Sequence, residues 1–95
     1  MIRFTAPLQL WTGGSGSWHF VVVPDDFGGE VRAHALGSDR GFGSVRVDVT
    51  VGDAIWRTSI FPMKAGGYFL PVKADARRKA GIAAGDSISV ILELL

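Results

Sequence analysis

Hydrophobic and polar residues alternate along much of the chain, with the period of two that is typical of half-buried β-strands. The clearest run covers residues 45–51, in which four valines alternate with polar residues. Gly52 and Asp53 interrupt this run, and a second alternating run follows at 54–61. The pattern predicts two antiparallel strands joined by a two-residue hairpin turn, in which Gly52 supplies a positive φ angle at the first position.

This turn would fix the register of the two strands. It places Val49 opposite Trp56 and Asp48 opposite Arg57. Opposite charges that face each other across a strand pair contribute about 0.2–1 kcal/mol to a sheet. A cross-strand ion pair is therefore the structural explanation for Asp48 and Arg57, which otherwise resemble the charged residues of an active site.

Similar patterns predict four further strands and two short helices. The expected strands are 2–11, 18–23, 68–73 and 87–94, and the expected helices are 30–36 and 75–80. A glycine follows each helix, Gly37 after the first and Gly81 after the second, and glycine commonly ends helices.

The expected elements follow the same order in both halves of the chain. Residues 2–51 and 54–94 each give strand, strand, helix, strand, although residue identity between the halves is low. Neither half has enough strands to bury a sheet face by itself. The predicted fold is therefore mainly β: a single domain over 1–95, monomeric, forming a six-stranded pseudo-dimeric barrel of order ββαβ-ββαβ with a short helix at each end.

Composition and charge limit the function classes. The chain has 95 residues and no cysteine, which excludes disulfides and cysteine-ligated zinc. The N-terminal residues lack the pattern of a secretory signal, and no apolar run approaches the roughly 20 residues of a membrane-spanning helix. A cytoplasmic protein without a membrane partner is expected. The net charge of +1 disfavours nucleic acid as a partner, because neutralising several phosphates requires a basic surface. The basic cluster of the sequence, Arg77-Arg78-Lys79, is expected to be a solvated face of the second helix.

Two sets of motifs carry a resemblance to known families. Residues 70–88 contain a strand, a helix, the pair Gly85-Asp86 and a further strand. This segment resembles swapped-hairpin, double-split β-barrel proteins, a group that includes transition-state regulators and antitoxins that bind DNA as dimers.

A second resemblance covers more of the chain. Its motifs are Gly-Phe-Gly-Ser-Val at 41–45, Trp-Arg-Thr-Ser-Ile-Phe-Pro at 56–62 and Gly-Tyr-Phe-Leu-Pro-Val-Lys at 67–73, with the strand at 18–24 upstream. These motifs are similar to a prokaryotic family of unknown function whose members form a single-chain double-split barrel. Some members also carry a helical domain associated with bacteriocin protection. The resemblance implies a fold and no particular activity.

Groups that could perform catalysis or bind a metal are sparse. His19 and His34 are the two histidines, and their spacing does not suggest a metal site. No serine, histidine and acid occur in the context of a catalytic triad. We therefore expect no catalytic residue, no metal and no cofactor. An enzyme that uses Ser59, His19 or Asp86 in a cleft stays an open alternative.

A ligand site is expected where polar residues interrupt apolar strands. Arg46, Arg57, Ser59 and Lys73 form this set, with Trp56 as an aromatic wall, and the cations suit a small anion or an acidic peptide. The alternative is an ordinary outer face of the barrel with scattered charges. The preferred function is a non-catalytic binding module for a small anionic ligand or a protein partner. A DNA-binding regulator, by analogy of fold, and a small enzyme are the alternatives.

Overall fold

A computed structural model of the chain describes residues 1–14, 16–37 and 43–95. The motif at 41–45 therefore lies partly outside the described residues. In chain order the elements are β1 (Ile2–Pro7), β2 (Gln9–Gly13), β3 (Gly16–Val23), the 3₁₀ helix η1 (Asp25–Phe27), α1 (Gly28–Leu36), β4 (Val45–Val51), β5 (Ala54–Pro62), β6 (Tyr68–Pro71), α2 (Ala74–Ala80) and β7 (Ser87–Leu94).

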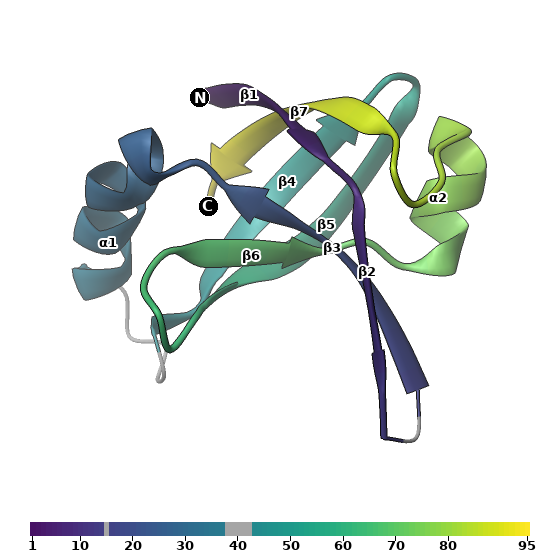
Figure 1. The fold of residues 1–95 in the computed structure, drawn as a ribbon. Coiled ribbons are helices and arrows are strands. Elements are labelled where there is room, and N and C mark those ends of the chain that lie inside the picture. The colour runs from purple at the N-terminus through teal and green to yellow at the C-terminus, as the bar shows by residue number, and fades with distance from the viewer. Residues whose placement is uncertain (15, 38–42) are drawn as a thin grey trace.

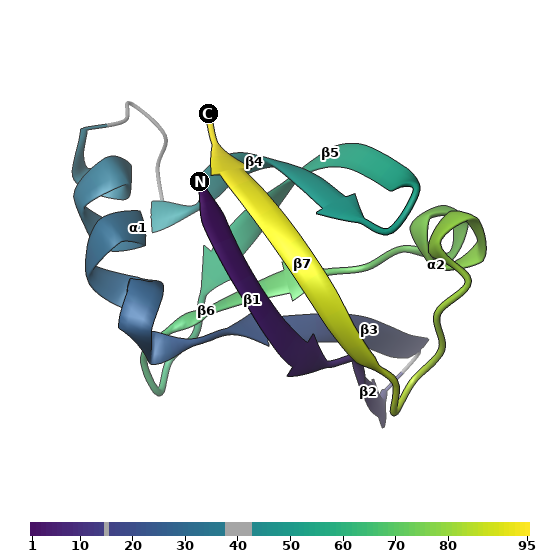
Figure 2. The ribbon, with the colours of Figure 1, turned by 90° about the horizontal axis from the view of Figure 1, so that it is seen from above.

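The strands form one antiparallel sheet that curls into a half-barrel (Figure 1). Its order is β1-β7-β4-β5-β6-β3-β2. The mainly β class is confirmed. The two helices lie at opposite ends of the sheet, as Figure 2 shows from above. Within the described residues, neither helix is long and apolar enough to cross a membrane.

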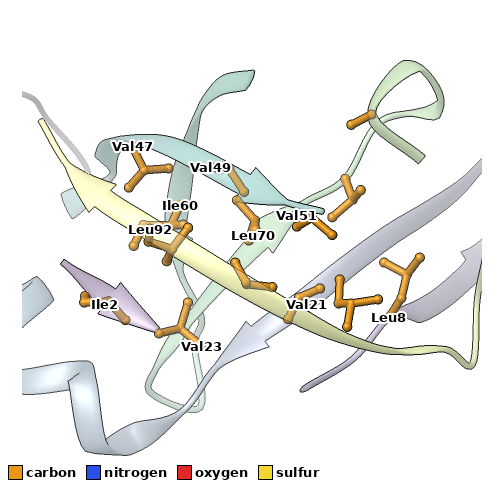
Figure 3. Packing of buried hydrophobic residues seen from close by; sticks show 14 of the residues in the cluster. Ile2, Leu8, Val21, Val23, Val47, Val49, Val51, Ile60, Leu70 and Leu92 are labelled. Carbon is orange, nitrogen blue, oxygen red and sulfur yellow. The ribbon is translucent and has the colours of Figure 1, made fainter. Parts of the chain in front are cut away.

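The core is aliphatic and fills the inside of the curled sheet (Figure 3). The four valines of β4 are buried, and the polar residues between them are partly exposed, as the alternation predicts. Val21, Val23, Leu70 and Leu92 join them from the neighbouring strands. Among the described residues no polar or charged residue is buried, so this core is held by apolar packing.

The predicted hairpin between β4 and β5 is confirmed. Val49 pairs with Trp56 and Asp48 pairs with Arg57. Gly52 has a φ of 57°, the left-handed conformation that the two-residue turn requires. Local sequence is enough to determine this register, because the alternation and the turn residues agree.

Replacing Gly52 by Ala should lower the free energy of unfolding by about 1 kcal/mol, because a β-carbon is strained at positive φ. Gly29→Ala is the matched control. Gly29 lies in α1, where an added β-carbon meets nothing within 4 Å, so helix propensity predicts about 0.5 kcal/mol of stabilisation. Urea denaturation measures both. The account is contradicted if Gly52→Ala is as stable as Gly29→Ala.

The expected count of six strands is wrong, because the first strand is divided at Leu8. The Leu8 side chain turns into the core, and its backbone N–H donates to Asp86 O at 2.8 Å while Gly85 N–H donates to Leu8 O at 2.8 Å. On one side of Leu8, β1 pairs with β7, and on the other side β2 pairs with β3. A distant turn therefore interrupts the strand and gives seven strands.

The other expected elements are found with adjusted ends. The second half gives β5, β6, α2 and β7, the predicted order, whereas the first half carries the additional strand. The two halves pair their strands in the same way. β1 pairs with β7 as β5 pairs with β4, and β2 pairs with β3 as β5 pairs with β6. The pairs β3–β6 and β4–β7 each join a strand to its counterpart in the other half. A duplicated, pseudo-dimeric architecture stays a prediction that these pairings favour.

Candidate functional site

Two of the predicted site residues, Arg46 and Ser59, lie opposite each other on the outer face of β4 and β5. Both are partly buried, and neither lines any of the four hollows described below. The structure therefore confirms their register and does not bring them into a concave site.

Arg57 is held by Asp48 on the same outer face. Its Nε donates to Asp48 Oδ1 at 2.8 Å, and its Nη2 donates to Oδ2 at 3.3 Å. The hydrogen bond from Arg57 lowers the pKa of Asp48, and Asp48 in turn raises the pKa of Arg57. The two side chains remain well exposed, 58% for Arg57 and 36% for Asp48. The cross-strand ion pair is thus formed as the sequence predicts.

The lowered pKa of Asp48 makes stability depend on pH at the acid end. Because the ionised carboxylate favours the folded state, its contribution is present above the ordinary carboxyl pKa of about 3.9 and is lost as the pH falls through the lowered pKa. In Asp48→Asn the free energy of unfolding should therefore decrease less steeply than in the wild type as the pH falls below about 4. Arg57→Gln should flatten the same part of the profile. A wild-type slope in both variants would contradict the ion pair.

A hollow of about 230 Å³ lies between α2 and the start of β5. We call it the α2–β5 hollow; its lining residues are Ala54, Ile55, Trp56, Arg57, Lys73, Asp75, Ala76 and Lys79. It brings together three of the five predicted site residues, Trp56, Arg57 and Lys73. It also adds Lys79, which the sequence analysis did not include.

A second hollow, of about 260 Å³, lies between α2 and β3. We call it the α2–β3 hollow; its lining residues are Ser17, Trp18, His19, Pro71, Val72, Lys73, Ala74 and Arg77. Lys73 lines both hollows and therefore stands between them. The pairing of β3 with β6 brings β3 next to the start of α2, and it continues as a hydrogen bond from Val72 N–H to His19 O at 2.9 Å.

The position of Arg77 follows from the first turn of α2. Its backbone N–H donates to Lys73 O at 3.0 Å, which places the two residues one helical turn apart. Its side-chain Nη1 donates to Val72 O at 2.7 Å, which holds the guanidinium beside the strand. Burial and the charge of Arg77 both lower the pKa of His19 in the same hollow, burial having the larger effect.

The end of the molecule that carries α2 has cations without acidic partners. Arg78 is paired with Asp75, as Arg57 is with Asp48. Lys73, Arg77 and Lys79 take part in no ion pair among the residues that the structure describes. These three cations line two adjoining hollows, so the local field favours an anion there.

A third hollow, of about 330 Å³, is apolar and was missed by the sequence analysis. We call it the aromatic groove; its lining residues are Trp11, Trp18, Phe20, Met63 and Phe69. Trp11 and Trp18 face each other across β2 and β3 and are 55% and 59% exposed. The rings of Phe20 and Phe69 lie 6.2 Å apart in an edge-to-face arrangement.

Three residues of the aromatic groove, Trp11, Trp18 and Phe20, come from the hairpin of β2 and β3, and Met63 and Phe69 come from the β5–β6 connection and β6. The far end of this hairpin extends away from the rest of the sheet (Figure 1). Trp18 and Phe20 are two residues apart on β3, so they share one face. That spacing was visible in the sequence. The register that places Trp18 opposite Trp11, and the pairing of β3 with β6 that brings Phe69 close, could not be predicted, because both depend on the fold.

A larger hollow, of about 510 Å³, lies by the start of α1 and contains Asp25 and Arg32 among its lining residues. Because Asp25 and Arg32 carry opposite charges, the lining of this hollow has no net charge. It is therefore a poorer candidate for binding an anion than the hollows beside α2. No group of three or more potential metal ligands occurs within the described residues.

The structure is thus a curled, mainly β domain with a group of cations at the end beside α2. The family model described as "Domain of unknown function (DUF1905)" matches residues 4–92. The chain belongs to the DUF1905 family. The predicted resemblance to a family of unknown function is therefore confirmed, whereas the relation to swapped-hairpin proteins and the helical domain of other members stay predictions. A comparison with curated proteins gives no match.

Proposed function

We propose that this domain is a non-catalytic binding module for a small anionic ligand, which it holds at the end of the sheet beside α2. The observation that carries the proposal is the group of Lys73, Arg77 and Lys79 around two adjoining hollows, without acidic partners among the described residues. Arginine and lysine bind phosphate and carboxylate groups through charge-assisted hydrogen bonds.

The side chains have different roles in this proposal. Lys73 lines both hollows and reaches an anion in either. Arg77 is already oriented by Val72 O, which reduces the entropy lost when it binds. Trp56 supplies an apolar wall, and Arg57 contributes less because Asp48 already neutralises it. Arg46 and Ser59 line neither hollow and are left out of the proposed site.

The size of the hollows favours a small ligand. Pockets for drug-sized molecules have volumes of about 300–1,000 Å³. The two hollows beside α2 have about 260 and 230 Å³, which suits a phosphate, a pyrophosphate or a short carboxylate better than a large metabolite.

Duplex DNA is the weaker candidate. A duplex binder typically neutralises about 6–10 phosphates. Here three cations are grouped beside α2, and the carboxylate of Asp75 lies among them. The other described cations that form no ion pair lie on separate elements or connections and make no continuous basic track; they are Arg3, Arg32, Arg46 and Lys64. The charge distribution therefore supports a small anion better than a polyanion.

Isothermal titration calorimetry with pyrophosphate at low ionic strength tests the proposal. We expect a Kd below about 1 mM, with binding weakened in 0.5 M salt because charge pairing near the surface is screened. Glycerol, a neutral ligand of similar size, is the control and should give no binding heat. Absence of pyrophosphate binding, binding that salt does not change, or much tighter binding of duplex DNA would overturn the proposal.

A further inference from the structure

We infer that the ligand carries an aromatic ring joined to its phosphate group through a short spacer, as the ribose joins base and phosphate in a mononucleotide, with the ring in the aromatic groove and the phosphate at Lys73 and Arg77. This inference rests on the proposed anion site and names the class of ligand that the site takes. It combines two features of the structure, the shared wall of two hollows and the contrast between their linings.

Trp18 is the shared wall. It lines the aromatic groove together with Trp11, and it lines the α2–β3 hollow together with Lys73 and Arg77. The two hollows therefore meet at Trp18, with the aromatic groove on the face of β3 that carries Trp18 and Phe20 and the α2–β3 hollow toward Ser17 and His19. A ligand that passes β3 at Trp18 would reach aromatic carbon in one hollow and cationic nitrogen in the other.

The aromatic groove is suited to a flat ring. Its five lining residues are Trp11, Trp18, Phe20, Met63 and Phe69, and they expose almost entirely apolar surface. Trp11 and Trp18 are more than half exposed although they are among the largest apolar side chains of the chain. Such clustered exposure in a monomeric domain commonly marks a binding surface. Aromatic side chains stack on nucleobases whatever the base, because every base presents a π-face.

The adjoining hollow is suited to the phosphate. Lys73 and Arg77 supply positive charge, and Arg77 has a planar guanidinium already held against Val72 O. The Ser17 hydroxyl is a further hydrogen-bond donor in the lining. No acidic residue lines this hollow within the described chain. The phosphate of a nucleotide thus fits the α2–β3 hollow, and its base fits the neighbouring aromatic groove.

The charges beyond the groove favour a single nucleotide over a strand. Met63 joins the aromatic groove to the hollow by the start of α1. The charged residues of that hollow are Asp25 and Arg32, which give no surplus positive charge. The phosphates of a longer strand would find no cationic track on that side, so we commit to a small nucleotide.

Calorimetric titrations with inorganic phosphate, adenosine and AMP test the inference. We expect AMP to bind at least about tenfold more tightly than either phosphate or adenosine, because only AMP occupies both hollows. Trp18→Ala should remove the advantage of AMP over inorganic phosphate, so that the two ligands bind the variant with similar affinity. Lys73→Gln should weaken both phosphate and AMP. Amide NMR spectra of each variant establish that it is folded.

Leu10→Ala is the matched control for Trp18→Ala. Leu10 lies on the same hairpin, is 48% exposed, and pairs with His19 on the face opposite the groove. Its replacement should leave AMP binding unchanged. A Leu10→Ala effect equal to that of Trp18→Ala would assign the loss to the hairpin and overturn the inference.

The outcomes separate this inference from the proposed function. If phosphate binds and AMP binds no more tightly, the aromatic part is wrong and the anion site stands. If neither phosphate nor AMP binds, the proposed function fails as well. AMP binding that survives Trp18→Ala, or adenosine binding as tight as that of AMP, would also overturn the inference. A single-stranded oligonucleotide that binds far more tightly than AMP would overturn the choice of a mononucleotide.

Discussion

Replacing Leu70 by Ala lowers the free energy of unfolding by about 2–5 kcal/mol, the largest effect on stability that we expect from the substitutions considered. Leu70 is fully buried at the centre of β6, where it pairs with Val21 of β3 (Figure 3). Removing its side chain leaves a cavity between strands that cannot easily close. Small domains have a total stability of about 5–15 kcal/mol, so this loss is a large share of it.

Urea denaturation measures the effect, and Leu36→Ala is the matched control. Leu36 is the last residue of α1 and is 81% exposed, so the same substitution there should change stability by less than about 0.5 kcal/mol. Equal effects at the two positions would mean that β6 does not lie in the core. Lys73 follows the end of β6 by two residues, so its position depends on β6. That result would therefore also mean that Lys73 is not placed where the proposed site requires it.

Lys73→Glu weakens pyrophosphate binding by more than about tenfold, the largest effect on binding that we expect. The substitution replaces attraction by repulsion in both hollows, because Lys73 lines both. Two unit charges 4 Å apart interact by about 1 kcal/mol even at the dielectric constant of water. Reversing the charge at residue 73 removes this attraction and adds a repulsion of similar size. About 1.4 kcal/mol of binding free energy corresponds to a tenfold change in affinity.

Lys64→Glu is the matched control, because it makes the same change of charge. Lys64 is exposed in the connection between β5 and β6 and lines none of the four hollows. We expect less than a twofold change in affinity at physiological salt, where charges separated by more than about 8 Å are screened. If the two variants lose affinity equally, net charge and not the site accounts for binding.

The sequence was sufficient where the determining interactions are local. The register of β4 and β5 follows from alternation and from Gly52 in the turn, so the pairing of Asp48 with Arg57 could be predicted. The break in the first strand could not. It depends on backbone hydrogen bonds between Leu8 and the turn at Gly85 and Asp86, almost eighty residues later in the chain.

The candidate site was predictable in part for the same reason. Trp56 and Arg57 are neighbours in the sequence, and Lys73 stood out as a cation at the end of the expected apolar strand 68–73. The contribution of Arg77 and Trp18 depends on the pairing of β3 with β6, two strands separated by more than forty residues. Alternation alone does not tell which strands pair, and so it did not identify the α2–β3 hollow or the aromatic groove.

The most direct test of the central claim is the location of pyrophosphate on the domain. Titration of ¹⁵N-labelled protein, followed by amide chemical shifts, gives that location without any substitution. Our account predicts shifts at the residues around the two hollows beside α2, including His19, Lys73, Arg77 and Lys79. Shifts confined to the hollow with Asp25 and Arg32, or no shifts up to 10 mM pyrophosphate at about 0.01 M added salt, would contradict it.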